Sequence, residues 1–167
     1  GVDRAVLQHD RIYGKLDSFL GECVRRYPDR FVAAAQVDEW VGGRPDQLDR
    51  LKREVEEFGF RTLYFSTGGF FHVDFNMEVN DPSLDPLWDL VQDLGISIHW
   101  YAAKLRLPST NDYLEELGQF ITWAEAHPDI PSVLTHGLNN IHYDKGEINR
   151  FSVPDELFTL LKFPNWH

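Results

Sequence analysis

Hydrophobic positions follow two alternating patterns along the chain. Short apolar runs, which are typical of buried strands, cover residues 4–7, 31–37, 62–65, 96–100 and 132–135. Between these runs, apolar residues recur at three- and four-residue spacing, which is typical of one face of a helix. The first such face is formed by Leu16, Phe19, Leu20, Cys23, Val24 and Tyr27. The pattern therefore predicts strands that alternate with helices.

Proline and glycine residues predict where these helices begin and end. Pro28 ends the first helix, because the residue before a proline is disfavoured in the α region. Gly59 and Gly95 follow the second and third helical faces, where glycine readily adopts the left-handed conformation of a helix cap. Pro86 and Pro154 lie near the start of the third and last helices, a position that suits proline.

The order of these elements predicts the fold class. The apolar runs begin about 27–37 residues apart, and a strand–helix–strand repeat of this length is typical of parallel βαβ units. A sheet covered on both faces accounts for continuous apolar strands. Two α/β architectures fit one domain of residues 1–167: an open doubly wound sheet, or part of a (β/α)8 barrel. The chain is too short for a complete barrel, which needs roughly 200 residues or more.

The charge balance narrows the range of partners. Sixteen Lys and Arg residues against 27 Asp and Glu residues give a net charge of −11. A chain this acidic repels phosphate groups, which disfavours nucleic acids and anionic membranes as partners. No apolar run approaches the roughly 18 residues of a transmembrane helix. The single cysteine excludes an internal disulfide and favours a reducing, cytoplasmic location.

Histidines gather where the predicted strands end. Ligands bind at the carboxyl ends of parallel strands in both architectures, and five of the seven histidines fall there: His9, His72, His99, His136 and His142. His99 ends the fourth strand, and His136 follows the fifth strand just before Gly137. Neutral imidazole is a common metal ligand, and its pKa of about 6.5 suits proton transfer. We therefore expect His99 and His136 to share one site.

Aromatic residues accompany these histidines. The candidates to line a substrate pocket, together with His72, are Phe70, Phe71, Trp100 and Tyr101. The same rings could equally pack the loops between strands and helices. The sequence has no glycine-rich phosphate loop after the first strand, which counts against a nucleotide-binding domain. It also has no Gly-x-Ser-x-Gly elbow and no paired cysteine motif.

Residues 85–90 form a predicted Asp-Pro-Leu-Trp-Asp-Leu helix, which is followed by a strand that ends in His99. This stretch is the most specific of several that resemble the amidohydrolase-related metal-dependent enzymes, the amidohydrolase-2 group. Residues 1–7 resemble the second barrel strand of that family, and residues 26–31 and 59–63 resemble its helix-to-strand junctions. The resemblance runs from Gly1 to at least His136.

The resemblance implies a (β/α)8 barrel of which about strands 2–6 are represented. It also implies one divalent metal, zinc or manganese, and a small-molecule substrate. Members hydrolyse amide, ester or lactone-type bonds, or decarboxylate aromatic and related acids without oxidation. His99 matches the metal-binding histidine of the family's fifth strand, and His136 matches its acid/base histidine after the sixth strand. The oligomeric state stays open, with a homo-oligomer as one option.

The departures from the family pattern leave alternatives. The family's first strand carries a His-x-His or Glu-x-His ligand pair and its eighth strand an aspartate ligand, and neither stretch occurs in this chain. The chain also starts without an initiator Met or a signal peptide. We therefore expect a mature protein or an internal piece that is a weak enzyme by itself. The alternatives are a non-catalytic open α/β domain that binds a ligand or partner, and an inactive fragment of the enzyme.

Overall fold

Parallel strands in chain order form the centre of the molecule. The computed structural model describes residues 2–8, 16–67, 77–101, 110–135, 143–144, 147–148 and 155–167. Its five-stranded sheet has the order β1 (Ala5–Leu7), β2 (Phe31–Ala35), β3 (Thr62–Ser66), β4 (Ser97–Tyr101) and β5 (Ser132–Thr135). Every neighbouring pair is parallel. A doubly wound sheet reverses its strand order at a switch point, so this sequential order excludes that alternative.

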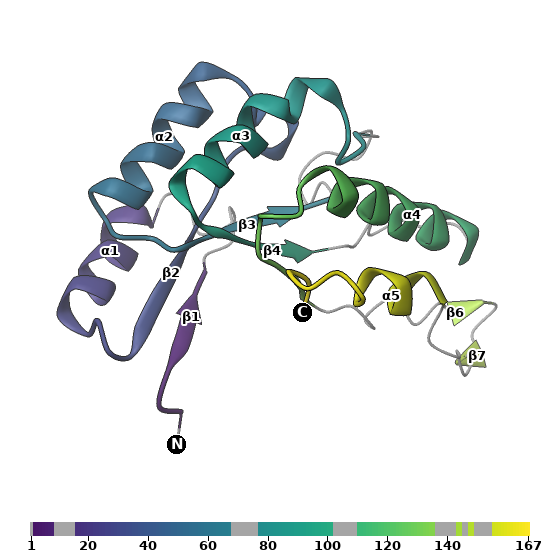
Figure 1. The fold of residues 1–167 in the computed structure, drawn as a ribbon. Helices are drawn as coiled ribbons and strands as arrows, with labels where there is room; N and C mark the ends of the chain where they lie inside the picture. The colour runs from purple at the N-terminus through teal and green to yellow at the C-terminus, as the bar shows by residue number, and fades with distance from the viewer. Residues whose placement is uncertain are drawn as a thin grey trace.

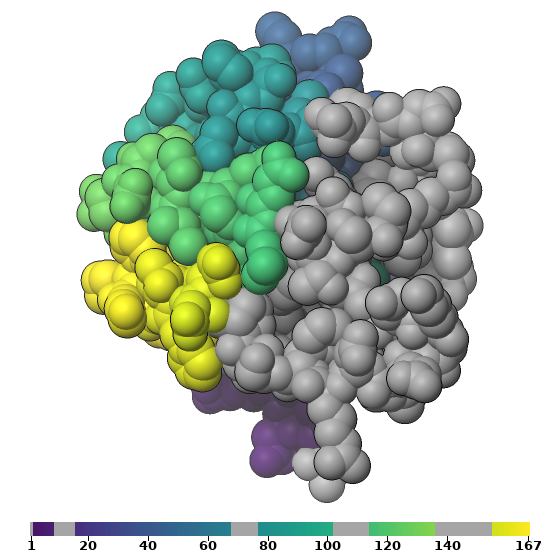
Figure 2. Space-filling model, turned by 90° about the vertical axis from the view of Figure 1, so that its right-hand side faces the viewer, coloured from purple at the N-terminus to yellow at the C-terminus, as the bar shows by residue number. Residues whose placement is uncertain are grey.

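The helices lie along one side of the sheet. They are α1 (Asp17–Arg26), α2 (Pro45–Glu56), α3 (Asp85–Leu94), α4 (Thr110–Ala126) and α5 (Asp155–Leu160). Figure 1 shows them following one another in an arc around the strands. In the space-filling view the segments that contain α3, α4 and α5 follow one another from top to bottom (Figure 2). The fold is half of a (β/α) barrel, which confirms the predicted fold class.

Local signals set the helix ends. Gly95 adopts the left-handed conformation after α3, with a φ of 61°, and Gly59 does so shortly after α2, with a φ of 72°. A side chain at either position would strain the backbone, so glycine suits both caps. Pro45 begins α2 three residues before Leu48, the first apolar position of this helix. Proline suits the first helical turn because its fixed φ angle is already close to the helical value.

Aromatic rings fill the space between the sheet and the helices. Trp100 of β4 is fully buried, with a relative exposure of 0%. Its ring centroid lies 4.9 Å from that of Trp123 and 5.1 Å from that of Phe120, both in α4. It lies 5.4 Å from Trp88 of α3 and 6.1 Å from Trp166. This cluster joins β4 to two helices and to the C-terminal residues.

The two ends of the sheet differ from the expected pattern. Val6 of β1 is 47% exposed, so the prediction of a buried first strand is wrong. Within the described part of the chain, β1 pairs with β2 alone. At the other end, residues after α5 run parallel to β5. Ser132 N–H donates to the Asn165 carbonyl over 2.7 Å, and Leu134 N–H donates to that of His167 over 3.0 Å. The repeat of strand and helix therefore continues past β5.

Two short features remain. The two-residue strands β6 (Tyr143–Asp144) and β7 (Glu147–Ile148) pair antiparallel in a separate sheet, which the apolar pattern does not predict. None of the helices in the described ranges combines the length and apolarity that crossing a bilayer requires.

Candidate functional site

Successive residues of the central strands face opposite sides of the sheet. The large apolar side chains of β3 and β4 belong to the buried cluster that contains the helices: Leu63, Phe65, Ile98 and Trp100. The residues between them therefore face away from the helices, on what we call the inner face. On β3 and β4 the inner face consists of Thr62, Tyr64, Ser66, Ser97, His99 and Tyr101. This face is polar and aromatic, unlike the side that packs against the helices.

The register of the sheet places His99 between two known neighbours. It pairs with Tyr64 of β3 on one side and with Val133 of β5 on the other. Tyr101 lies two residues further, at the carboxyl end of β4, and its ring stacks on that of Tyr64 at 6.4 Å between centroids and 21° between planes. The two tyrosine rings therefore lie next to each other near the carboxyl ends of the strands, where barrel sites are built.

The His99 side chain has the properties of a metal ligand. It is half-buried, and among the described residues it takes part in no side-chain hydrogen bond or ion pair. Burial lowers the pKa of His99 below its ordinary value of 6.5, because desolvation disfavours the charged imidazolium. The ring is consequently neutral near pH 7, the form that binds metals.

The donor chemistry fits a metal in part. Imidazole nitrogen suits zinc and also occurs at manganese sites, and His99 presents it to the inner face. The described part of the chain contains no group of three or more His, Cys, Asp or Glu residues that could hold an ion. His99 therefore accounts for one ligand, and further ligands would come from outside the described residues.

The structure separates the residues predicted for the site. His99 and Tyr101 lie together on the inner face. Trp100 does not reach it, because successive residues of a strand point to opposite faces and Trp100 packs fully buried among the helices. We therefore assign Trp100 to the core rather than to a substrate pocket. The remaining candidates lie outside the described residues: Phe70, Phe71, His72 and His136.

Sequence reasoning missed Tyr64 as a neighbour of His99. The signal was present, because Thr-Leu-Tyr-Phe-Ser at residues 62–66 and Ser-Ile-His-Trp-Tyr at residues 97–101 both alternate polar or tyrosine positions with apolar ones. The prediction of continuously apolar strands hides this alternation. Aligning the two strands by that period would have placed Tyr64 on the same face as His99.

Backbone and threonine hydroxyl contacts hold the carboxyl ends of β3, β4 and β5 together. Thr67 N–H donates to the Tyr101 carbonyl over 3.1 Å, and the Thr67 hydroxyl also contacts the buried carboxylate of Glu116 in α4. On the other side, the Thr135 hydroxyl donates to the Trp100 carbonyl over 2.6 Å. These contacts fix the strand ends beside the inner face.

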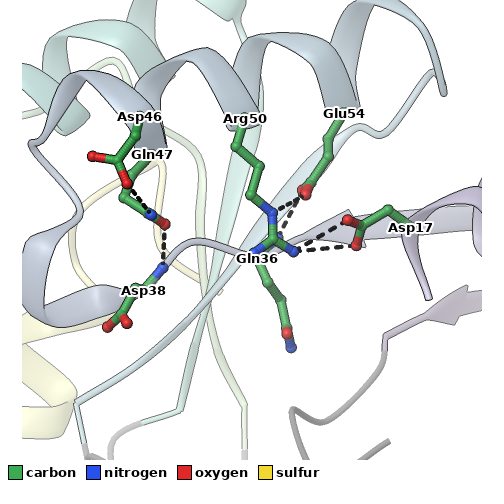
Figure 3. Close-up of polar contacts among 7 residues, drawn as sticks. All are labelled: Asp17, Gln36, Asp38, Asp46, Gln47, Arg50 and Glu54. Atoms are coloured by element: carbon green, nitrogen blue, oxygen red, sulfur yellow. Dashed lines mark hydrogen bonds and ion pairs between the residues drawn. The ribbon is translucent and has the colours of Figure 1, made fainter. Parts of the chain in front are cut away.

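A charged network lies at the carboxyl end of β2 (Figure 3). Arg50 of α2 donates to Glu54 one turn later, with 2.6 Å between Nε and Oε1. The same guanidinium contacts both Asp17 oxygens, at 3.2 and 3.3 Å. The second oxygen of Glu54 accepts the backbone N–H of Gln36 over 3.0 Å. Asp17 and Glu54 are both buried, so this network joins α1, α2 and β2 in the interior.

Burial governs the electrostatics of this network. It raises the pKa of Glu54 to about 7, and nearby Asp17 adds to that rise, while the Arg50 guanidinium and the Gln36 N–H oppose it. Burial also opposes the charge on Arg50, but its two carboxylate partners raise the Arg50 pKa. Arg50 therefore stays charged, and Glu54 is the member of the network that titrates near neutral pH.

A groove of about 660 Å³ lies elsewhere, among the C-terminal ends of α1 and α2 and the start of β2 and β3. Phe58 and Phe31 contribute apolar surface to it, and Glu22, Arg25 and Arg61 contribute charges. Because this groove opens beside the amino ends of the strands, it is separate from the inner-face residues around His99.

A family model described as amidohydrolase matches residues 1–147. None of the curated protein sequences is detectably similar to the chain. The matched span includes β1–β5 and both histidines that we single out, His99 and His136.

Several solved structures share the fold. An uncharacterised TIM-barrel protein from Bordetella bronchiseptica is 18% identical with a TM-score of 0.69, over 99% of this chain and 53% of that chain. A 2,6-dihydroxybenzoate decarboxylase in complex with 2,6-dihydroxybenzoate is 16% identical with a TM-score of 0.62, over 97% and 60%. A mutant 5-carboxyvanillate decarboxylase from Novosphingobium aromaticivorans with bound manganese is 16% identical with a TM-score of 0.60, over 86% and 50%. The chain thus spans about half the length of the structures it matches.

Proposed function

The chain belongs to the amidohydrolase family, and from this premise we propose that the protein acts as a metal-dependent hydrolase or decarboxylase. Its small-molecule substrate would carry an amide, ester or lactone bond, or the carboxylate of an aromatic or related acid. One observation carries the proposal: His99 presents a neutral imidazole, with no side-chain partner among the described residues, to the inner face of a half-barrel.

The residues would divide the work as follows. His99 holds one coordination position of a divalent ion, zinc or manganese. Such an ion supplies Lewis-acid polarisation and lowers the pKa of a bound water when present. His136, which directly follows the last residue of β5, acts as the general acid and base that transfers a proton to or from the substrate. Tyr101 lines the substrate pocket, and Phe70, Phe71 and His72 are the further proposed contacts.

The comparisons support decarboxylation and hydrolysis to different degrees. Of the three similar structures described above, two are decarboxylases, and one of these two contains manganese. At 16% identity this likeness concerns the fold, so decarboxylation and manganese stay parts of the proposal. The family match itself supports enzyme chemistry without selecting the bond that is broken.

The test compares His99→Ala with Val133→Ala in the full-length protein. Val133 is the neighbour of His99 in the same row and has no metal-binding group, so it is a matched control. We expect His99→Ala to lose zinc and manganese affinity by about 100-fold or more in calorimetric titrations, beyond the 10- to 100-fold typical of indirect ligand support. We also expect it to lose turnover of 2,6-dihydroxybenzoate, 5-carboxyvanillate or p-nitrophenyl acetate. Full metal affinity in His99→Ala would overturn the proposal.

A non-catalytic role is the second candidate. It is favoured by the single metal ligand that the described residues provide. Under this alternative, the protein binds an aromatic acid with unchanged affinity after metal removal, and none of the three probe compounds turns over. Metal-dependent turnover of any one of them excludes it.

A further inference from the structure

The end of β2 carries a polar residue that the proposed mechanism does not use. Gln36 directly follows Ala35, the last residue of β2, and is only 6% exposed. Its neighbours Ala35 and Val37 belong to the cluster that packs against the helices, so the side chain between them faces the inner side of the sheet. Figure 3 shows the Gln36 amide pointing away from Asp17, Arg50 and Glu54.

The register aligns this amide with the candidate metal ligand. Ala34 pairs with Thr62 and Ala35 with Leu63, so the next step along both strands sets Gln36 opposite Tyr64. Tyr64 in turn pairs with His99. Gln36, Tyr64 and His99 therefore form one row across three neighbouring strands, and adjacent strands lie about 4.8 Å apart.

The backbone of Gln36 lies beyond the ladder that joins β1 and β2. Ala5 N–H donates to the Arg30 carbonyl, so every second residue from Arg30 directs its N–H and carbonyl toward the β1 side. Gln36 belongs to this set. The last registered pair of that ladder is Leu7 with Ala33, which leaves the Gln36 N–H past the end of the ladder.

The charged network supplies a hydrogen-bond acceptor for this N–H. Glu54 accepts the Gln36 N–H, and Arg50 holds the Glu54 carboxylate while it also contacts Asp17. A buried carboxylate needs charge-assisted hydrogen bonds to stay in place. The three charged residues thereby fix the backbone from which the Gln36 side chain enters the inner face.

We propose that Gln36 is a further substrate-binding residue of this site, and that Asp17, Arg50 and Glu54 are the residues that position it. A primary amide offers two N–H donors and one carbonyl acceptor. Such a group recognises a substrate oxygen, as in a carboxylate, a carbonyl or a phenol hydroxyl. The inference rests on the proposed function, because it assumes that substrate binds on the inner face next to His99.

The first experiment replaces Gln36 by methionine, which keeps the length of the side chain and removes its polar atoms. The full-length protein is loaded with manganese, and the probe is whichever of 2,6-dihydroxybenzoate, 5-carboxyvanillate and p-nitrophenyl acetate turns over fastest. We expect Gln36→Met to raise KM about tenfold, the effect of one lost hydrogen bond of ordinary strength. Manganese content stays unchanged. Ser97→Ala, on the inner face but one row further from the strand ends, should leave KM within about twofold.

A spectroscopic readout accompanies the kinetics. In the zinc-loaded protein labelled with nitrogen-15, the side-chain amide signals of Gln36 should shift when the same probe is added. Unchanged KM in Gln36→Met together with unshifted amide signals would overturn the assignment. If no probe binds or turns over, or if His99→Ala keeps its metal, the proposed function is wrong. The assignment of Gln36, which rests on that function, is then wrong as well.

The second experiment tests the positioning residues. Glu54→Gln keeps an acceptor oxygen for the Gln36 N–H, whereas Glu54→Met removes it. We expect hydrogen exchange at the Gln36 N–H to accelerate about tenfold in Glu54→Met, with a matching rise in KM, and to change less in Glu54→Gln. Lys52→Met, an exposed substitution on α2, is the control.

The result is decisive in either direction. A Glu54→Met protein with wild-type exchange and wild-type KM overturns the positioning role. If Glu54→Met fails to fold, Arg50→Met takes its place, because Arg50 holds the Glu54 carboxylate, and the same rise in exchange rate and in KM is expected. A raised KM in Glu54→Gln, together with unchanged hydrogen exchange at the Gln36 N–H, contradicts the positioning role.

Discussion

Two neighbouring residues of β4 lie in opposite environments. Trp100 is fully buried among aromatic rings, and its indole N–H donates to the Ser132 hydroxyl over 3.1 Å. His99, the preceding residue, is half-buried and has no side-chain partner among the described residues. The strand thus presents the packed core on one face and the candidate chemistry on the other.

The difference teaches how this fold separates stability from function. Aromatic packing on the helix side gains from burial and ring contacts, and it leaves the inner face free to carry polar groups. Substitutions on the helix side should therefore change the free energy of unfolding, and substitutions on the inner face should mainly change binding. Three predictions test this separation, in order of decreasing effect.

The largest effect is expected for Trp100→Ala. Removing a fully buried indole loses its transfer free energy and leaves a cavity, so the free energy of unfolding should fall by about 3–5 kcal/mol in urea denaturation. His99→Ala is the matched control on the other face, and it should cost less than about 1 kcal/mol. Equal losses in the two variants would contradict the division between the faces.

A smaller effect is expected from pH, through Glu54. Its pKa rises from 4.5 to about 7 on folding, so the native state binds the proton more tightly than the unfolded state. The resulting stability is fully present below pH 4.5 and is lost as pH rises through 7. At about 1.4 kcal/mol per pKa unit, this group alone lowers the free energy of unfolding by up to about 3 kcal/mol.

The measurement compares wild type with Glu54→Gln in urea denaturation at pH 5 and pH 8. We expect wild type to lose stability relative to Glu54→Gln by about 1–3 kcal/mol between these two values. Asp46, an exposed carboxylate on the same helix, provides the control variant Asp46→Asn, which should not alter the pH dependence in this range. Identical pH profiles for wild type and Glu54→Gln would show that Glu54 does not titrate there.

The smallest effect is expected for the tyrosine pair on the inner face. Tyr64 and Tyr101 stack at 6.4 Å, and such pairs contribute about 0.5–1.5 kcal/mol beyond their burial. A double-mutant cycle with Tyr64→Leu and Tyr101→Leu should give a coupling of about 1 kcal/mol. A coupling several times larger would mean that the inner face also carries the core of the fold, and the separation would fail.

Much of the fold followed from local patterns. The predicted run at residues 132–135 matches β5, and the run at 96–100 differs from β4 by one residue at each end. Both predicted glycine caps have positive φ. These signals are readable because helix and strand periods, and the left-handed conformation of glycine, depend on residues close in the chain.

The candidate site followed only in part. His99 could be selected because it ends an apolar strand, where ligands bind in parallel sheets. The strand period could place Tyr64 on the same face, but it could not place Tyr64 opposite His99, because that pairing joins residues of different strands. The prediction groups Trp100 with His99 and Tyr101, although Trp100 is adjacent to both in the strand and adjacent residues point to opposite faces. Gln36 gave no motif at all, and its importance comes from the Glu54 contact over 18 positions.

By itself, the sequence determined the alternation of strands and helices, the positions of the caps and the resemblance to one enzyme family. Only the tertiary structure decided the sequential strand order, which of the two alternating sets faces inward, and the row of Gln36, Tyr64 and His99. The reason is physical. The periodicity of apolar residues reflects local backbone preferences. The register of the strands, and the side of the sheet that each residue faces, depend instead on hydrogen bonds and packing between segments about 30 residues apart.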